Sequence, residues 1–212
     1  DNSFSYYFTN ILILFTLFPY VSIYPIQTDI QPLIFVFGLI FFMNIFLYEK
    51  VKLTNFEIYF IFFSILSLIY INIFNDYDYF LQKRISLISA FVLYFVFSRN
   101  IQYLNFKYIY FGLIINLIAA IFHYLSPELF FELFSGKIIR IVKLKNDYDL
   151  MYRGVSGLTT EPSFLSIIGI YILIITIFLK NNIKKTTLIF SILFCLIILI
   201  LSNSGTGFVT IS

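Results

Sequence analysis

The chain has 212 residues, of which 60% are hydrophobic, 22% aromatic and only 12% charged. A typical soluble domain carries about 25% charged residues, so this composition excludes an ordinary soluble protein and indicates an integral membrane protein. The net charge is +3, and the basic residues are scattered between apolar runs, which excludes the basic stripe of a nucleic-acid-binding protein. The single cysteine, Cys195, cannot form an internal disulfide, and no cleavable signal peptide is visible.

Seven apolar segments follow one another along the chain, several of them near the roughly 20 residues that a helix needs to cross a bilayer. They cover residues 8–24, 32–48, 56–74, 85–97, 108–124, 162–179 and 186–201. Pro19 is expected to kink the first helix or to end it early. The fourth segment is short for a bilayer core, so it either begins earlier, near Tyr79, or is tilted. We therefore predict an all-α, polytopic integral membrane protein with about seven transmembrane helices.

The domain organisation expected from this pattern is a single transmembrane helical domain over residues 1–212, with one long extracytoplasmic loop at 125–161. The chain starts at Asp1 rather than at Met and stops just past an apolar run. These ends indicate a fragment of a longer protein.

Orientation follows from the distribution of Lys and Arg in the short loops, because positive loops stay in the cytoplasm. A cytoplasmic N-terminus places seven basic residues in inside loops and two in outside short loops. The inside residues are Lys50, Lys52, Arg99, Lys107, Lys180, Lys184 and Lys185, and the outside residues are Lys83 and Arg84. The long loop is then expected in the periplasm or at the cell exterior.

The long loop opens with Ser126-Pro127-Glu128, a favourable helix start with Ser as the N-cap and Pro in the first turn. This helix is expected to end at Ser135, before Gly136, and to lie in the membrane interface. Four cations follow between aliphatic residues: Lys137, Arg140, Lys143 and Lys145. This stretch either rests on anionic headgroups or forms a cationic rim that attracts a phosphorylated lipid.

Glu161-Pro162-Ser163 opens the sixth apolar segment. Proline suits the first turn of a helix, whose N-terminus offers unpaired N–H groups and a dipole that favour phosphate. Ser163 adds a hydroxyl, and Glu161 could accept a proton from a substrate hydroxyl. In the alternative interpretation, Glu161 only favours the positive end of the helix dipole and Thr160 caps the helix.

Arg153 precedes two nearby glycines, Gly154 and Gly157. Glycine lets the backbone approach a ligand closely, and arginine binds phosphate oxygens in pairs. The alternative is a solvated arginine near lipid headgroups.

The seventh apolar segment ends in small polar residues: Ser202, Asn203, Ser204 and Thr206, with Gly205 and Gly207. They either allow close helix packing or line a site that binds sugar or phosphate. His123, the only histidine, closes the fifth segment and is expected to be structural. Asp147 and Asp149 could hold a cation, although no His/Cys metal-site spacing is present.

Together, Arg153-Gly154, Gly157, Glu161-Pro162-Ser163 and the later Ser202-x-Ser204-x-Thr206-Gly207 resemble the O-antigen polymerase family, which belongs with the O-antigen ligases. The resemblance covers residues 125–212 in detail and the earlier segments in architecture only. It implies a membrane enzyme that joins oligosaccharide units carried on a polyprenyl diphosphate at the outer face of the inner membrane.

Carried over by position, the resemblance implies Arg153 as a diphosphate-binding residue and Glu161 as the general base or orienting acid. Arg140, Ser163, Ser202, Ser204 and Thr206 are the further candidates for substrate binding. Family members have a second external loop with essential arginines, which this chain does not reach. We expect no metal and no cofactor, because arginines and a helix end can supply the positive charge that a leaving diphosphate requires.

The expected partners are the lipid-linked oligosaccharide and the bilayer, with a chain-length regulator as one candidate protein partner. The competing interpretations are a flippase for the same lipid and a non-enzymatic membrane subunit of a glycan assembly complex. A transporter would favour repeated halves and broken helices near the bilayer midplane, and the sequence has no internal repeat. Polymerase and ligase remain open, as do the sugar and its linkage.

Overall fold

The computed structural model describes residues 2–21, 32–48, 53–74, 80–134, 137–138 and 154–203. Over these residues the secondary structure is helical, apart from one isolated antiparallel bridge between Val21 and Ile138. The prediction of an all-α fold is therefore confirmed. The chain divides into two compact units, the first comprising Asp1–Thr16 with Thr28–Leu104 and the second Leu17–Gln27 with Asn105–Ser212.

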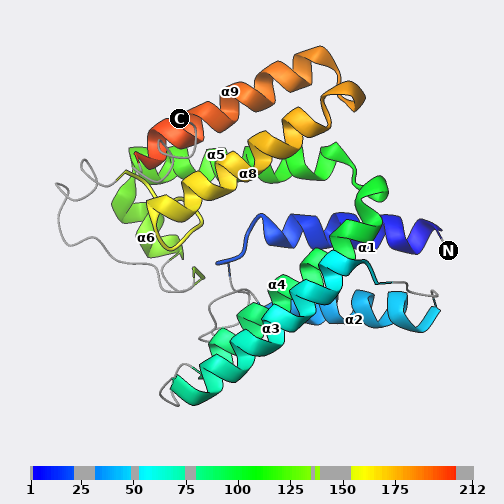
Figure 1. Cartoon of the computed structure of the whole chain (residues 1–212). Coiled ribbons are helices and arrows are strands. Elements are labelled where there is room, and N and C mark those ends of the chain that lie inside the picture. The colour runs from blue at the N-terminus through cyan, green and yellow to red at the C-terminus, as the bar shows by residue number, and fades with distance from the viewer. Residues whose placement is uncertain are drawn as a thin grey trace. The chain divides into compact units, whose positions relative to one another are not determined.

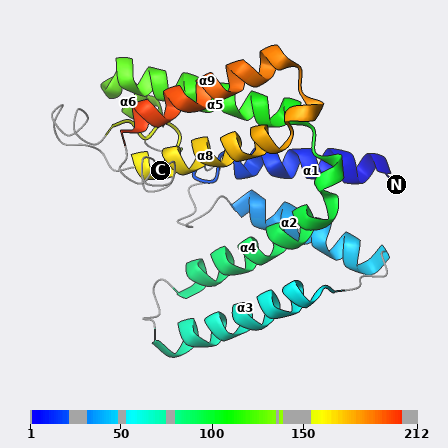
Figure 2. The same cartoon turned by 45° about the horizontal axis from the view of Figure 1, so that its top comes forward.

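Where the structure describes it, the first unit consists of helices, one of them a short 3-10 helix (Figures 1 and 2). They are α1 (Asn2–Thr16), α2 (Pro32–Tyr48), α3 (Asn55–Phe74), α4 (Phe80–Asn100) and η2 (Ile101–Tyr103). The second unit contains α5 (Phe106–Leu125), α6 (Pro127–Phe134), α8 (Pro162–Phe178), η3 (Lys180–Asn182) and α9 (Lys185–Ser202). The bounds of α2 coincide with the predicted apolar run 32–48, whereas α1 ends within its run and α4 begins before its run.

Two boundaries resolve alternatives that the sequence left open. The first helix ends at Thr16, before Pro19, rather than continuing to residue 24 as its apolar run predicts. Residues 17–20 instead form a turn in which the Val21 amide donates to the Phe18 carbonyl over 3.2 Å. Pro19 has no N–H to donate to a helix, which accounts for the early end. The fourth helix begins at Phe80, so the early start near Tyr79 is the better prediction.

Within the described residues, two helices are long and apolar enough to cross a membrane: α5 with 20 residues and α9 with 18. Shorter apolar helices cover Phe4–Thr16, Leu33–Ile45, Asn55–Ser67 and Pro162–Phe178. Only 28% of the spanning window of α9 is buried within the protein, whereas the core helix of a soluble protein would be mostly buried. The number of spans and their orientation stay predictions.

The first unit packs α1, α2 and α4 around an aromatic core that includes Phe41, Phe95 and Val96, all at most 1% exposed. Helix α3 lies against α4, and its other face presents large apolar side chains outward. The exposed residues include Phe56, Ile58, Tyr59, Phe62, Phe63, Ile65, Leu66, Ile69 and Tyr70. A helix that exposes aromatic residues while burying a carboxylate, Glu57, is typical of contact with lipid rather than with water.

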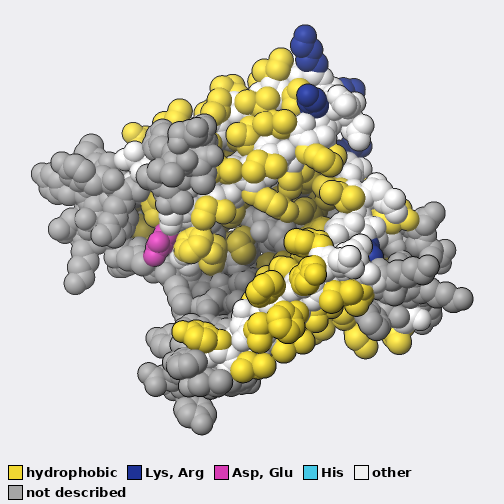
Figure 3. Space-filling view, viewed as in Figure 1, with side chains coloured by type: hydrophobic (Ala, Val, Ile, Leu, Met, Phe, Trp, Pro, Cys, Tyr) yellow, Lys and Arg dark blue, Asp and Glu magenta, His cyan; other side chains and the backbone are white. Residues whose placement is uncertain are grey.

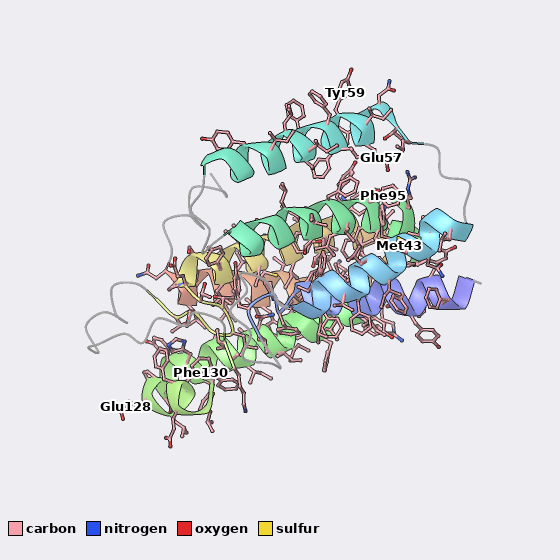
Figure 4. All side chains as sticks on the ribbon, turned by 90° about the horizontal axis from the view of Figure 1, so that it is seen from below. Met43, Glu57, Tyr59, Phe95, Glu128 and Phe130 are labelled. Atoms are coloured by element: carbon pink, nitrogen blue, oxygen red, sulfur yellow. The ribbon has the colours of Figure 1, made fainter. Side chains whose placement is uncertain are left out.

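That buried carboxylate forms an ion pair with Arg99 near the end of α4. One Arg99 Nη2 lies 2.8 Å from Glu57 Oε1 and 3.0 Å from Oε2. The amide and hydroxyl of Thr54 also donate to Oε2, over 2.7 and 3.0 Å, and the Glu57 amide returns a bond to the Thr54 hydroxyl. This capping box fixes the start of α3. The Arg99 guanidinium lies 4.3 Å from the Phe95 ring centre, and Figure 4 shows Glu57 pointing toward α4 while Tyr59 points away.

In the second unit α8 and α9 lie antiparallel and side by side, with α5 against α9 (Figures 1 and 2). Gly169 allows a close contact, because a Cβ there would lie 3.2 Å from Cγ2 of Ile198. The exposed Lys180, Lys184 and Lys185 gather at the turn between α8 and α9, where Figure 3 shows a group of basic side chains beside a broad hydrophobic surface. The opposite end of these helices holds the motif of residues 154–161.

The ion pair makes a prediction about stability. Arg99→Met leaves the Glu57 carboxylate buried without its cation, which costs about 3 kcal/mol of unfolding free energy. Chemical unfolding in detergent would measure this loss. Glu57→Gln/Arg99→Met should lose much less than the sum of the two single variants, and the exposed Lys184→Met serves as the control. Additive losses in the double variant would show that the two side chains do not interact.

Candidate functional site

The segment Gly154–Glu161 folds against the ends of two helices of the second unit. The Val155 amide donates to the carbonyl of Leu201 near the end of α9 over 3.0 Å. The Gly157 amide donates to Nδ1 of His123, near the end of α5, over 3.2 Å. Residues 154–159 are buried. Residues 154–159 of the motif are therefore packed against the helix ends.

Both glycines are required by the backbone geometry. Gly154 has φ +77° and Gly157 has φ +54°, the left-handed region that residues with a side chain rarely adopt. A Cβ on Gly154 would also fall on the carbonyl group of Ser202, far inside van der Waals contact. A Cβ on Gly157 would lie 3.6 Å from the Cα of Ala120 on α5. Glycine is therefore required at position 154 by both its φ and the close approach to α9, and at position 157 by its φ.

The His123 side chain is held firmly and is only 1% exposed. Its ring stacks on Phe130 of α6 with centres 4.5 Å apart and planes 7° apart, and it meets Phe131 edge-on at 5.0 Å. Because a backbone N–H can only donate, Nδ1 must be the acceptor toward Gly157. The proton of the neutral ring therefore sits on Nε2, which has no hydrogen-bond partner among the described residues.

Thr159 ties the middle of the loop to the start of α8. Its hydroxyl lies 2.7 Å from the carbonyl oxygen of Ser156 and 2.7 Å from that of Glu161, so its one proton is shared between the two acceptors. The Thr159 amide donates to the same Ser156 carbonyl over 3.0 Å. Ser156 Oγ lies 3.5 Å from Nδ1 of His123. Polar contacts through Ser156 and Thr159 thus connect His123 on α5 to Glu161, the N-cap residue of α8.

Glu161 is the N-cap residue of α8, with extended φ −143° and ψ 154°, and its side chain makes no capping hydrogen bond. The carboxylate is exposed, and Ser163 Oγ donates to Oε2 over 3.4 Å. Because the side chain does not cap the helix, the carboxylate is left facing outward. The alternative in which Thr160 caps this helix is not what the geometry shows.

Fewer free amides remain at this helix start than the sequence suggests. The Phe164 and Leu165 amides donate to the Glu161 carbonyl over 3.1 and 3.4 Å, and Pro162 has no N–H. Among these first helical residues, only the Ser163 amide has no acceptor in the described part of the chain. The Ser163 amide is therefore free to bind an anion, whereas the Ser163 hydroxyl would first have to give up its hydrogen bond to Glu161.

The predicted site residues have different outcomes in the structure. Glu161 and Ser163 lie together, as described. Ser202 is fully buried and donates to the Leu199 carbonyl over 2.8 Å, an arrangement that favours its packing alternative. Four further candidates, Arg140, Arg153, Ser204 and Thr206, lie outside the described residues, as do Asp147 and Asp149. In the described ranges no group of three or more His, Cys, Asp or Glu side chains could hold a metal ion.

The predicted helix after Ser126 is observed as α6, from Pro127 to Phe134. Its Phe130 and Phe131 are buried, whereas Glu128 and Glu132 are exposed. Figure 4 shows Glu128 at the outer side of the helix and Phe130 toward α5. The aromatic side of α6 thereby covers His123. The sequence singled out His123 as structural but could not show that its partner is the motif loop, 34 residues further along the chain.

In comparisons with known proteins, no family model, no curated protein and no solved structure matches this chain.

The glycine geometry predicts that Gly154→Ala displaces the motif loop. A methyl group there would occupy the space of the Ser202 carbonyl, so the Val155–Leu201 hydrogen bond should be lost. Limited proteolysis in detergent should then cut residues 154–161 faster than in the unchanged protein. Gly169→Ala is the matched control, because its Cβ meets only side-chain atoms of Ile198 and Leu199, 3.2 Å away or more. Equal cleavage of all three proteins would contradict this account of the loop.

Proposed function

We propose that this protein is a membrane glycosyltransferase that polymerises oligosaccharide units carried on a polyprenyl diphosphate. The observation that carries the proposal is the loop of residues 154–161. Its first half is fixed to α5 and α9, and it ends at Glu161, an exposed carboxylate at the start of an apolar helix. Such a loop presents an acid and adjoining residues rigidly at the end of apolar helices, where the sugar and diphosphate of a lipid-linked substrate would lie.

The chemistry needs only a few groups. A sugar hydroxyl of the acceptor unit attacks the anomeric carbon of the donor, and the bond from that carbon to the diphosphate oxygen breaks. Glu161 accepts the hydroxyl proton, which its outward-facing carboxylate allows. The polyprenyl diphosphate leaves with the bonding electrons, and positive charge nearby stabilises it. Arg153, next to the fixed Gly154, is the proposed cation, and the Ser163 amide and hydroxyl could add donors.

The exposed apolar faces of the helices supply the other requirement. A polyprenyl chain stays in the bilayer, so the enzyme must bring its site to the membrane surface. We propose a multi-pass protein of a bacterial inner membrane with about seven spans, a cytoplasmic N-terminus and the loop at 125–161 on the outer side. In that orientation Lys180, Lys184 and Lys185 face the cytoplasm, at the end of α8 and α9 away from Glu161.

The proposal includes the remaining predicted residues and partners. Arg140, Ser204 and Thr206 are further candidates to bind the diphosphate or the sugars, and Ser202 would act by packing the end of α9. A lipid-linked flippase and a non-enzymatic subunit are the alternatives. The exposed carboxylate at a helix end favours the enzyme over both, because a non-enzymatic subunit needs no proton acceptor and a transporter places its coupling-ion site near the bilayer midplane.

The test uses the surface polysaccharide of a strain that lacks the gene and receives variants of it. Glu161→Gln and Arg153→Ala should reduce polymerisation by about a hundredfold or more, the range expected on losing an acid–base or charge-stabilising group. Gel electrophoresis of the polysaccharide would then show single repeat units in place of a ladder. Single units on the surface also show that lipid-linked units still reach the outer face.

Glu128→Gln is the matched control, since Glu128 is an exposed carboxylate on α6. It should keep the normal ladder, with equal membrane levels of all variants checked by immunoblot. Normal ladders for both motif variants would contradict the transferase assignment. Loss of all surface glycan, single units included, would favour the flippase.

A further inference from the structure

We propose that His123 is a positioning residue for the proposed transferase site and acts through its Nδ1 atom as a neutral ring. This inference rests on the proposed function for its catalytic consequence. The structural part, that Nδ1 holds the loop, stands on the geometry alone. His123 would touch no substrate in this role, because it is buried beneath α6 and the loop.

The acceptor at Nδ1 is the key contact. The Gly157 amide is buried and donates to Nδ1 over 3.2 Å. A buried amide without an acceptor is strongly unfavourable, so the loop can hold this conformation only if the acceptor is present. A residue with a side chain at position 157 would be strained, because its φ is +54°. The loop conformation therefore depends on both the histidine and the glycine.

The effect reaches Glu161 through short contacts. Ser156, adjacent to Gly157, presents its carbonyl to both the amide and the hydroxyl of Thr159. The same hydroxyl lies 2.7 Å from the Glu161 carbonyl, which in turn accepts from the amides of the first turn of α8. Displacing Gly157 would thus shift the residue that carries the proposed base.

The surroundings of the ring hold it in the required orientation. Phe130 covers one face of the ring and Phe131 meets it edge-on. Nδ1 faces Gly157, so Nε2 carries the proton, and that N–H has no partner among the described residues. The acceptor at Nδ1 and the donor at Nε2 can therefore be tested separately. The proposal requires the acceptor at Nδ1 and assigns no function to the donor at Nε2.

Two substitutions separate these nitrogens. The side-chain oxygen of His123→Asn falls near the position of Nδ1 and can accept from Gly157. The amide nitrogen of His123→Gln falls near Nε2 and leaves the Nδ1 position without an acceptor. His123→Leu keeps an apolar volume and supplies neither group. Tyr124→Leu is the control on the same helix end, because Tyr124 is 64% exposed.

The first readout is hydrogen exchange of the peptide that contains residues 154–161, measured by mass spectrometry on protein in detergent. His123→Leu and His123→Gln should exchange about tenfold faster or more, as expected on losing one buried hydrogen bond. His123→Asn and Tyr124→Leu should exchange as the unchanged protein does. This readout does not depend on the reaction, so it tests whether His123 holds the loop even if the transferase assignment fails.

The second readout is the polysaccharide ladder. His123→Leu and His123→Gln should shorten it and His123→Asn should restore it. Fast exchange with a normal ladder would overturn the catalytic part of the proposal, because the loop would then be displaced without effect. Restoration by Gln but not by Asn would overturn the assignment of Nδ1 and point to the Nε2 donor. Unchanged exchange in all three variants would overturn the positioning role itself.

Discussion

The burial of residues 154–159 of the loop is the constraint on which the proposed site depends. A backbone that leaves helical geometry among apolar residues must still find a partner for each N–H and C=O group. In this loop, two amides donate hydrogen bonds to neighbouring helices, one to the Leu201 carbonyl and one to Nδ1 of His123. A lone histidine and two glycines thereby become parts of one structure, although they lie on different segments of the sequence.

The same requirement explains buried polar residues in both units. Glu57 is 3% exposed in a helix whose outward face is aromatic, and it is tolerated because Arg99 and Thr54 satisfy its oxygens. The buried hydroxyls of Ser166, Thr176 and Ser191 donate to carbonyls of their own helices. These polar groups are thus turned inward and paired, while large apolar side chains face out. That reversal of the soluble pattern agrees with the membrane class indicated by composition.

The helices could be predicted from the sequence because their apolar runs are long and end at polar residues. The bounds of α2 coincide with the predicted segment 32–48, and α6 begins after Ser126 as its capping residues indicate. The early end of α1 was one of two outcomes that Pro19 allowed. Local rules suffice for such features, since a cap or a proline acts on its immediate neighbours.

The geometry of the site could be predicted only in part. Glu161 and Ser163 belong to one three-residue motif, so their proximity follows from sequence alone. The contact of Gly154 with Ser202 and that of Gly157 with His123 join segments far apart in the chain, and no local pattern specifies such pairs. The free amides of α8 were also overestimated, because the Glu161 carbonyl accepts two of them. Positions of Arg140 and Arg153 lie outside the described residues.

The central claim, that the protein forms glycosidic bonds from a lipid-linked diphosphate, is tested most directly with purified protein. The protein in lipid vesicles would receive a synthetic polyprenyl-diphosphate oligosaccharide together with a chelator, and the products would be analysed by mass spectrometry. We expect glycans of two or more units, one polyprenyl diphosphate released for each new bond, and no loss of activity from the chelator. If folded protein leaves the substrate as single units, the claim is contradicted. Activity that is restored only by Mg²⁺ would contradict a metal-independent reaction.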